Sequence, residues 1–501
     1  MSQISIRGRL AALSAAIGLA LSVGAVAAPT FVNGVVFAGN SVDATRVPGA
    51  NQGRLGMFSD LYFDEARGEW WALSDRGPGG GLLDYATRVQ RMEIDFDERS
   101  GAIRKARVKQ TVAFTDPRGL LSAPTSGTAT PAAFNGQNPL LLNGDRAQLG
   151  RSFDPEGLVV DPRSGDLIVA DEYGPSVYVF NRRGQLQRVF ETPANLVPRA
   201  ALGGVVDYVE TDRTKMLSGR QDNRGFEGLA VTPDGKRLVA VLQDPVLTDP
   251  SPANARNGRN VRVVVYDNDR RSANYGKGIA QYAYQLEAQA DVLARIVAAG
   301  GLGSSTDPRQ GRNIGLSAIV ALNNTDFLVL ERDNRGLGVD DPAGANVVGS
   351  KRVYRISLAG ATDVSGVASL GQTTLAADII PVLKSPMLID LAANSVLPNS
   401  KTAEKWEGLA VGPRLKGGAR VLVAGNDNDY SVTQTGAGTQ YDVYVDFTGG
   451  STQRDIDSPS TMDGVEVGLP PTGYSLIPGV LHAYRLEAAD LAGYKPPRNH
   501  D

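Results

Sequence analysis

One pattern recurs five times along this chain: a short apolar strand, a tight turn, a second apolar strand, and then a cluster of acidic residues. The apolar runs are rich in Val, Leu and Ile, and Pro, Gly, Asn and Asp fill the turns, which predicts buried β-hairpins. Such a repeat constrains the fold strongly, because each unit can bury its apolar faces only against its neighbours. The five hairpins occupy residues 59–76, 154–172, 226–244, 316–333 and 406–429.

Strands with alternating polar and apolar residues follow four of these hairpins, at 176–180, 261–266, 352–356 and 481–486. Two buried strands with one or two amphipathic outer strands form the blade of a β-propeller, in which neighbouring blades cover each other's edges. We therefore predict an all-β fold, a β-propeller with five clear blades and between five and seven in total. The N-terminal strand at 31–38 is a candidate for a sixth blade.

The repeats are longer than the ~40 to 50 residues of compact propeller repeats, so long loops are expected between the strands. Residues 115–150 and 248–260 have the composition of such loops, and helical patches occur at 291–299 and 374–393. A parallel β-helix is the alternative architecture. It requires short and uniform repeats, which this sequence does not have.

The acidic residues all fall at one end of the predicted hairpins. The start of the first strand and the end of the second lie side by side, so every repeat delivers carboxylates to the same face. Carboxylates at this density repel one another unless cations lie among them, and Ca²⁺ prefers such oxygen ligands. We predict these metal ligands: Asp60, Asp75, Asp171, Glu172, Asp244, Asp333, Asp427 and Asp429.

Basic residues are interleaved with these acids. Guanidinium and ammonium groups pair with phosphate oxygens, so we predict that Arg76, Arg224, Arg332 and Lys405 bind a phosphate ester. Each charged residue also has a structural explanation, since an acid at a strand end can accept backbone N–H groups and an Arg beside it can form an ordinary ion pair. The consecutive acids at 171–172 and the Asn-Asp-Asn-Asp run at 426–429 favour a functional face.

Four motifs, in this order, resemble the bacterial phytase-like family, described as having esterase-like activity of phytase: Phe-Glu-Gly-Leu-Ala-Val at 226–231, Glu-Arg-Asp at 331–333, Trp-Glu-Gly-Leu-Ala-Val at 406–411 and Asn-Asp-Asn-Asp at 426–429. The resemblance extends from about residue 50 to 487. It implies a β-propeller and a phosphoric-ester hydrolase activity credited to the repeated Glu and Asp residues. On this chain these are Glu156, Glu227, Glu331, Asp333, Glu407 and Asp427, and the four glutamates are the candidate catalytic residues.

The resemblance is incomplete in two respects. Ser317 stands where other repeats have Glu, so the ring of acids has a gap. The Lys- and Tyr-rich phosphate pocket of the calcium-dependent β-propeller phytases cannot be mapped onto this sequence, so phytate is not implied as the substrate.

The first 27 residues have the features of a secretory signal: Arg7 and Arg9, an apolar stretch at 10–26, and the small residues Ala25 and Ala27. We predict cleavage near Ala27, a periplasmic or secreted location, and one propeller domain over 28–501. No later stretch reaches the ~18 apolar residues of a membrane span, so no membrane span is expected.

Composition excludes several classes of function. The chain has no Cys and two His, which disfavours zinc and haem, and its formal charge of −3 disfavours nonspecific nucleic-acid binding. His482 lies in an alternating strand and no Gly-x-Ser-x-Gly motif occurs, which disfavours a Ser-His-Asp hydrolase. No nucleotide cofactor is expected, and the sequence does not determine the oligomeric state.

Three functions are consistent with these residues. The first is a calcium-dependent hydrolase of a small-molecule phosphate ester. The second is a gluconolactonase-like esterase or lactonase, with one metal ion held by Glu156, Glu227 and Asn426 or Asp427. The third is a non-enzymatic binding propeller whose acids hold structural calcium.

Overall fold

The computed structural model describes residues 29–45, 53–121, 132–249, 256–301, 314–435, 438–456, 461–462, 465–466 and 471–497. The predicted signal peptide at 1–27 lies outside the described residues, as do parts of the predicted loops at 115–150 and 248–260. No helix in these ranges is both long and apolar enough to cross a membrane.

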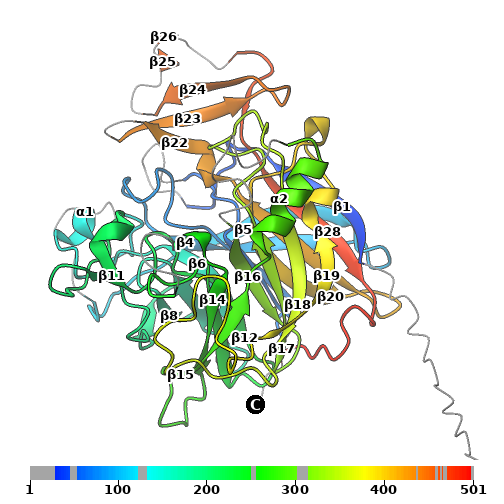
Figure 1. Ribbon diagram of the computed structural model, residues 1–501. Coiled ribbons are helices and arrows are strands. Elements are labelled where there is room, and N and C mark those ends of the chain that lie inside the picture. Colours follow the sequence, from blue (N-terminus) through cyan, green and yellow to red (C-terminus); the bar gives the residue numbers. More distant parts are fainter. Residues whose placement is uncertain are drawn as a thin grey trace, which may run out of the picture.

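Five antiparallel four-stranded sheets form the body of the molecule (Figure 1). The first contains β2 (Asp60–Asp64), β3 (Glu69–Leu73), β4 (Arg88–Phe96) and β5 (Ile103–Ala113). The second contains β6 (Pro155–Val160), β7 (Leu167–Asp171), β8 (Ser176–Phe180) and β9 (Leu186–Val189). The third contains β12 (Phe226–Val231), β13 (Arg237–Leu242), β14 (Asn260–Asp267) and β15 (Gly278–Gln285). The fourth contains β16 (Gly315–Ala321), β17 (Asp326–Arg332), β18 (Lys351–Ser357) and β19 (Leu383–Asp390).

The fifth sheet is built from both ends of the chain. Its order is β20 (Lys405–Arg414), β21 (Arg420–Asp427), β28 (Gly479–Leu486) and β1 (Thr30–Phe37). The expectation that the N-terminal strand forms a sixth blade is therefore wrong, because β1 pairs with β28 as the outer strand of this sheet. Joining the first and last strands in one sheet ties the two ends of the domain together.

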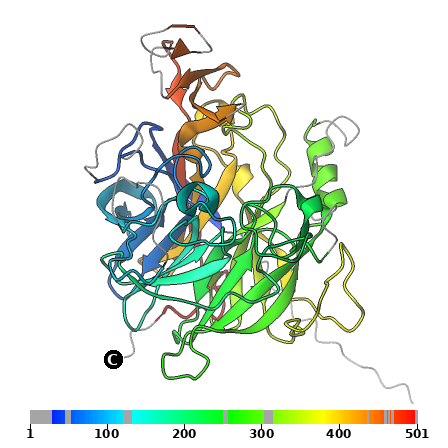
Figure 2. The same cartoon turned by 90° about the vertical axis from the view of Figure 1, so that its left-hand side faces the viewer.

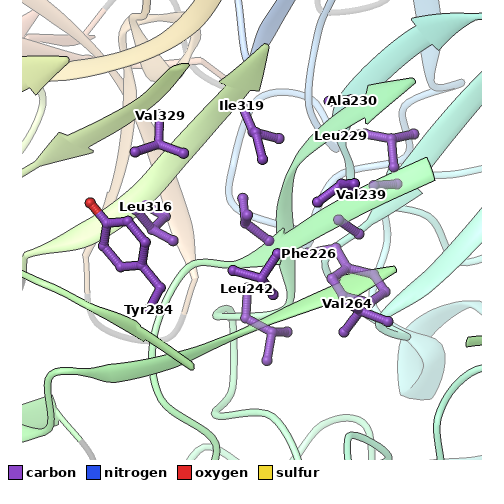
Figure 3. Close-up of a cluster of buried hydrophobic side chains, with 14 of the residues drawn as sticks. Phe226, Leu229, Ala230, Val239, Leu242, Val264, Tyr284, Leu316, Ile319 and Val329 are labelled. Carbon is purple, nitrogen blue, oxygen red and sulfur yellow. The ribbon is translucent and has the colours of Figure 1, made fainter. Parts of the chain in front are cut away.

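The first strands of the five sheets contact one another in the cyclic order β2, β6, β12, β16, β20 and back to β2. This closed ring confirms the predicted β-propeller. Apolar side chains fill the space between neighbouring sheets, and Phe226 and Leu229 of the third sheet belong to the same buried cluster as Leu316 and Ile319 of the fourth (Figure 3). Each fully buried side chain of this size contributes about 1.5–3 kcal/mol, which lets the fold form without disulfides.

An additional sheet is inserted between β21 and β28. It contains β22 (Val432–Thr435), β23 (Thr439–Val445), β24 (Ser451–Asp455), β25 (Thr461–Met462) and β26 (Val465–Glu466), with β27 (Ser475–Leu476) paired to β23. Figures 1 and 2 both show this sheet standing above one end of the propeller. Because β22 starts five residues after Asp427 at the end of β21, the sheet lies at the end that carries the acidic residues.

The remaining elements are short. The hairpin of β10 (Arg199–Ala200) and β11 (Met216–Ser218) and the helix α1 (Pro139–Asn143) belong to the long loops. The predicted helical patch at 291–299 forms α2 (Gln289–Ala298), whereas the patch at 374–393 forms no α-helix and ends in the short 3-10 helix η3 (Leu391–Ala393). Most of its second half is β19, where Pro386 opposes a helix and is tolerated because β19 is an edge strand; Pro381 lies two residues before this strand.

Candidate active site

A β-bulge lies at the same point of four of the five repeats. The register between the first and second strands shifts at residue 156 in β6, 227 in β12, 317 in β16 and 407 in β20. A bulged residue leaves the regular ladder, and its side chain is re-aimed. Three of these residues, Glu156, Glu227 and Glu407, line one cavity. The bulge thus explains how the glutamate of the repeated motif reaches the site.

The glycine after each glutamate allows neighbouring first strands to come close. A Cβ on Gly157 would lie 2.7 Å from the main-chain N of Leu229, and one on Gly228 would lie 3.0 Å from the Cα of Ala318. Neither distance leaves room for a side chain. The Glu-Gly pair therefore narrows the ring and gathers the three glutamates at its centre.

The polar cavity has a volume of about 170 Å³ and lies at the acidic end of the ring. Eight carboxylates and four cationic side chains line it, so acids outnumber bases two to one. All four predicted phosphate-binding residues are present: Arg76, Arg224, Arg332 and Lys405. The predicted catalytic residues Glu156, Glu227 and Glu407 and the predicted metal ligands Asp75, Glu172 and Asp427 also line it.

Arg332 lies between two of the glutamates. Its Nη2 donates to Glu407 and is 3.7 Å from Oε1 of Glu227, and only 4% of the residue is exposed. It belongs to the same repeat as Ser317, the one bulge position without a glutamate. The repeat that breaks the ring of acids thus supplies the cation that joins two of its other members.

The other three cations each pair with an acid at the rim. Nη1 of Arg76 is 3.1 Å from Oδ2 of Asp154, and Nε of Arg224 is 3.1 Å from Oδ2 of Asp244. The ammonium of Lys405 donates to Asp429 and lies 3.4 Å from Oδ2 of Asp427; both aspartates come from the Asn-Asp-Asn-Asp run. Asp244 and Asp429 therefore hold cations of the cavity from just outside it.

Two groups of carboxylates have the spacing of metal ligands. In the first, oxygens of Asp75, Asp154 and Glu156 all lie within 4.8 Å of one another, and all three residues are buried. Asp75 forms a second such group with Asp427 and Asp429. In the described residues no donor hydrogen-bonds to the Glu156 carboxylate, although only 8% of that residue is exposed. The first group is therefore buried and closely spaced, and among the described residues Arg76, beside Asp154, is the cation paired with it.

Comparison with known proteins gives the family. The sequence pattern of the family described as "Phytase-like: Esterase-like activity of phytase" matches residues 53–430. The chain belongs to this phytase-like family. It is also 28% identical over 316 residues to an "Uncharacterized secreted protein" of Arthroderma benhamiae (strain ATCC MYA-4681 / CBS 112371), and the match spans 57% of each chain.

Two solved structures align with most of this phytase-like chain. Hydrazine synthase of Kuenenia stuttgartiensis is 14% identical, with 78% of this chain and 80% of that chain covered and a TM-score of 0.29. The Dos1 propeller is 10% identical, with 88% and 70% covered and a TM-score of 0.22.

Several carboxyl groups of the phytase-like cavity have raised pKa values, because they are buried close to one another. Burial, and then the neighbouring Asp154 charge, raise the pKa of Asp75 to about 7 and that of Glu172 to about 8. Burial and the charge of Asp429 raise the pKa of Glu404 to about 8. Burial, followed by repulsion from Glu227, also raises the pKa of Glu156 well above its usual range. Without an added cation, the cavity therefore favours protonated carboxyl groups near neutral pH.

Six predicted site residues do not line the cavity of the phytase-like protein. Two of them, Asp244 and Asp429, pair with its cations from outside, and the other four are Glu331, Asp60, Asp171 and Asp333. The carboxylate of Glu331 accepts bonds from Tyr284, Lys384 and the main-chain N of Glu287. The reason is the alternation of side chains along β17, which turns Glu331 away from the face that Arg332 occupies. The structure thus does not bring the fourth candidate catalytic glutamate to the other three.

The carboxylates of Asp60, Asp171 and Asp333 accept hydrogen bonds from main-chain N–H groups. Asp60 accepts from Leu61 and Leu158, each at 2.7 Å, and its strand pairs with β3 without a bulge. Asp171 accepts from the main-chain N of Asp154 at 2.9 Å, and Asp333 from that of Gly349 at 2.6 Å. These hydrogen bonds agree with the structural explanation, in which an acid at a strand end accepts main-chain N–H groups.

Sequence reasoning missed several residues of the site. Asp154 lies two positions before Glu156, at the start of the second hairpin. It is an acid at the same end of the hairpin as the predicted ligands, and this could have marked it as a candidate. Gln243 donates to Glu227 and ends its hairpin where other repeats have an acid, so its position could also have been read from the repeat. Asn223, Asn334, Asp340 and Glu404 come from connecting segments, outside the regular pattern of the strands.

Proposed function

We propose that this phytase-like protein is an exported, calcium-dependent hydrolase of phosphate esters that acts in the polar cavity. The observation that carries the proposal is the group of Asp75, Asp154 and Glu156 at metal-binding spacing, in a cavity that also contains Arg76, Arg224 and Arg332. A metal site beside several guanidinium groups is the combination that phosphoryl transfer requires.

The residues present fit calcium. Ca²⁺ takes about 6–8 oxygen ligands. Each carboxylate can bind through one or both of its oxygens, so three carboxylates can provide about half of these ligands or more. Asp75, Asp154 and Glu156 would hold the ion, and the unpaired carboxylate of Glu156 supports this assignment. Bound calcium would act as a Lewis acid that stabilises negative charge on the phosphoryl group.

The protein's own cations would orient the ester. Arg332 is fixed between Glu227 and Glu407, and the Nε of this buried guanidinium has no hydrogen-bond partner among the described residues. A phosphate oxygen is a fitting acceptor for that free donor. Arg76 and Arg224 line the same cavity and would bind further phosphate oxygens. Such positioning lowers the barrier by holding the reacting groups in place.

Glu172 is suited to proton transfer. It is buried, it lines the cavity, and its Oε1 has no hydrogen-bond partner in the described part of the chain. A carboxyl group in this position can take a proton from water or give one to the leaving alcohol. This assigns Glu172 an acid–base role in place of the metal-binding role predicted from sequence.

The lactonase alternative receives less support. Its third ligand was Asn426 or Asp427, and the amide of Asn426 is already hydrogen-bonded: Nδ2 donates to the main-chain O of Asp427 and Oδ1 accepts from the main-chain N of Val480. This leaves Asp427, whose Oδ2 lies 3.4 Å from the ammonium of Lys405. Export is supported by the signal-like first 27 residues and by the relative that is named a secreted protein.

The test uses purified protein stripped of metal with a chelator. Hydrolysis of p-nitrophenyl phosphate and bis-p-nitrophenyl phosphate is measured with and without Ca²⁺ for the wild type, Glu156→Gln, and Glu93→Gln on the outer part of the first sheet as a control. We expect calcium to restore turnover in the wild type and the control, and Glu156→Gln to lose at least 100-fold. A calcium-dependent rise in melting temperature without turnover of either ester would instead favour a binding propeller.

A further inference from the structure

A second cavity of about 120 Å³ adjoins the first and shares Asp75 and Arg76 with it. One wall is the glycine-rich loop from Gly77 to Gly80, and the opposite wall is the start of β22 with Gln440 of β23. The inserted sheet that stands above the propeller in Figures 1 and 2 therefore supplies part of this cavity. A molecule held at Arg76 can extend from the first cavity into the second.

The lining of the second cavity is polar but nearly uncharged away from the shared end. Besides Asp75, Arg76 and Asp429, it consists of glycines, Thr433, two glutamines and one apolar residue, Val432. Its lining among the described residues contains no aromatic ring, so stacking with a nucleobase is unsupported, and a single valine offers little to an acyl chain. A second phosphate would meet the carboxylate of Asp429, and the cation of this lining, Arg76, is already paired with Asp154.

Hydrogen-bonding groups are nonetheless available. Across the described ranges, the main-chain N–H groups of Gly79 and Gly80 donate to no protein acceptor. Gln440 is 1% exposed, and its Oε1 also lacks a hydrogen-bond partner within those ranges. Together with the Thr433 hydroxyl, these groups provide donors and acceptors without net charge, which is what hydroxyl groups of a ligand require.

We propose that this second cavity binds the alcohol portion of the phosphate ester, and that this portion is a neutral polyhydroxylated group, such as a monosaccharide or a small polyol, carrying a single phosphate. The inference rests on the proposed function, since the first cavity must hold the phosphate. It assigns substrate specificity to the loop at 77–80 and to the inserted sheet, neither of which belongs to the repeated motifs.

Gly80 offers a way to fill the second cavity alone. A Cβ added there meets nothing within 4 Å, and its φ of +59° is one that Asn tolerates. Gly80 lines the cavity, so Gly80→Asn adds a side chain at its glycine-rich wall without a steric clash. Gly68, at the turn between β2 and β3, has a φ of +62° and equally open surroundings, so Gly68→Asn is the matched control. Thr433→Val is a second variant that removes one hydroxyl and keeps the side-chain shape.

The experiment measures binding of inorganic phosphate and of glucose 1-phosphate by calorimetry, in the presence of Ca²⁺. We expect glucose 1-phosphate to bind the wild type and Gly68→Asn at least tenfold more tightly than phosphate. Gly80→Asn should lose this advantage, Thr433→Val should reduce it several-fold, and both should bind phosphate as the wild type does.

Two results would overturn the inference. If phosphate binds but glucose 1-phosphate binds no more tightly, or if Gly80→Asn keeps the full advantage, the second cavity is not the alcohol site and the proposed function stands. If neither compound binds the wild type, the proposed function fails and the inference fails with it.

Discussion

The two ends of the central ring are built from the same five strands and have opposite character. At the end where the first strands begin, three bulged glutamates and four cations surround a polar cavity. At the other end, Tyr62, Val231 and Val411 are among the residues of an apolar pocket that Tyr494 and Pro497 of the C-terminal segment also line. The strands are continuous between the ends, so only the local backbone and side chains differ.

The comparison shows how one repeat can serve both stability and chemistry. Toward the hairpin turns the pairing is regular, side chains interlock and apolar burial provides free energy of folding. At the bulges the ladder opens, and buried carboxylates with raised pKa values gather there at a cost in stability. The molecule therefore concentrates its unfavourable electrostatics at one end of the ring, where a bound cation can relieve them.

A substitution in the metal-spaced carboxylates at the polar end of the ring should have the largest effect on turnover. Asp75 belongs to both metal-spaced groups, so Asp75→Asn is expected to reduce calcium-dependent turnover at least 100-fold, a loss of about 3 kcal/mol of transition-state stabilisation. Calcium titration by calorimetry should show the matching loss of binding. Stability of the calcium-free protein should not fall, because the substitution removes a buried negative charge.

Asp171→Asn provides the contrast to Asp75→Asn. Its carboxylate accepts main-chain N–H groups of Asp154 and Gly174, so the substitution should lower the free energy of unfolding by about 1–3 kcal/mol. A denaturant melt in calcium-free buffer would measure it. Equal destabilisation by the two substitutions would contradict the division between site and scaffold drawn here.

Gly228 lies where the first strands β12 and β16 come close, and a substitution there tests how tightly the ring is closed. A Cβ there would lie 3.0 Å from the Cα of Ala318 and from the main-chain N of Ile319, so Gly228→Ala must push two first strands apart. We expect a loss of about 1–3 kcal/mol in the free energy of unfolding. Gly366→Ala, where a Cβ meets nothing within 4 Å, is the control. A neutral result at Gly228 would mean that the ring is less tightly closed than the structure indicates.

The pH dependence should separate the calcium-free and calcium-bound proteins. Burial raises the folded-state pKa of Asp75 to about 7 and those of Glu172 and Glu404 to about 8, whereas unfolded carboxyls titrate near pH 4. Between these values the folded state binds more protons, so calcium-free stability should fall as pH rises from about 5 to 8. Saturating calcium should flatten or reverse this slope in thermal melts. A slope unaffected by calcium would argue that the carboxyls do not hold the ion.

Sequence reasoning recovered the architecture because hairpin periodicity is a local property. The five apolar hairpins and the outer strands were readable from alternation and turn residues, and all four predicted cations reached the cavity. What it missed depends on pairing between distant segments. The N-terminal strand resembles the start of a blade, and only the register of β1 against β28 reveals that it completes the last sheet.

The predicted site residues that lie away from the cavity have a similar explanation. Glu331 and Arg332 are adjacent, and the sequence alone does not specify which of them faces the centre of the ring. Asp60 aligns with the glutamates of the other repeats, yet it lies in the one hairpin without a register shift at this position. Bulges depend on the hydrogen bonds between two strands, so their effect on side-chain direction is not visible in either strand by itself.

The smallest expected effect lies at the apolar end. Tyr494 lines the pocket there and its ring stacks under the Arg420 guanidinium at 4.8 Å. Tyr494→Ala should remove this contact and part of the apolar cover, lowering the free energy of unfolding by about 1 kcal/mol. Turnover of p-nitrophenyl phosphate at saturating calcium should stay within twofold of wild type, because the first strands separate Tyr494 from the polar cavity. If turnover fell as strongly as in Asp75→Asn, the two ends would be coupled through the ring, and the carboxylates would depend on packing at the far end for their position.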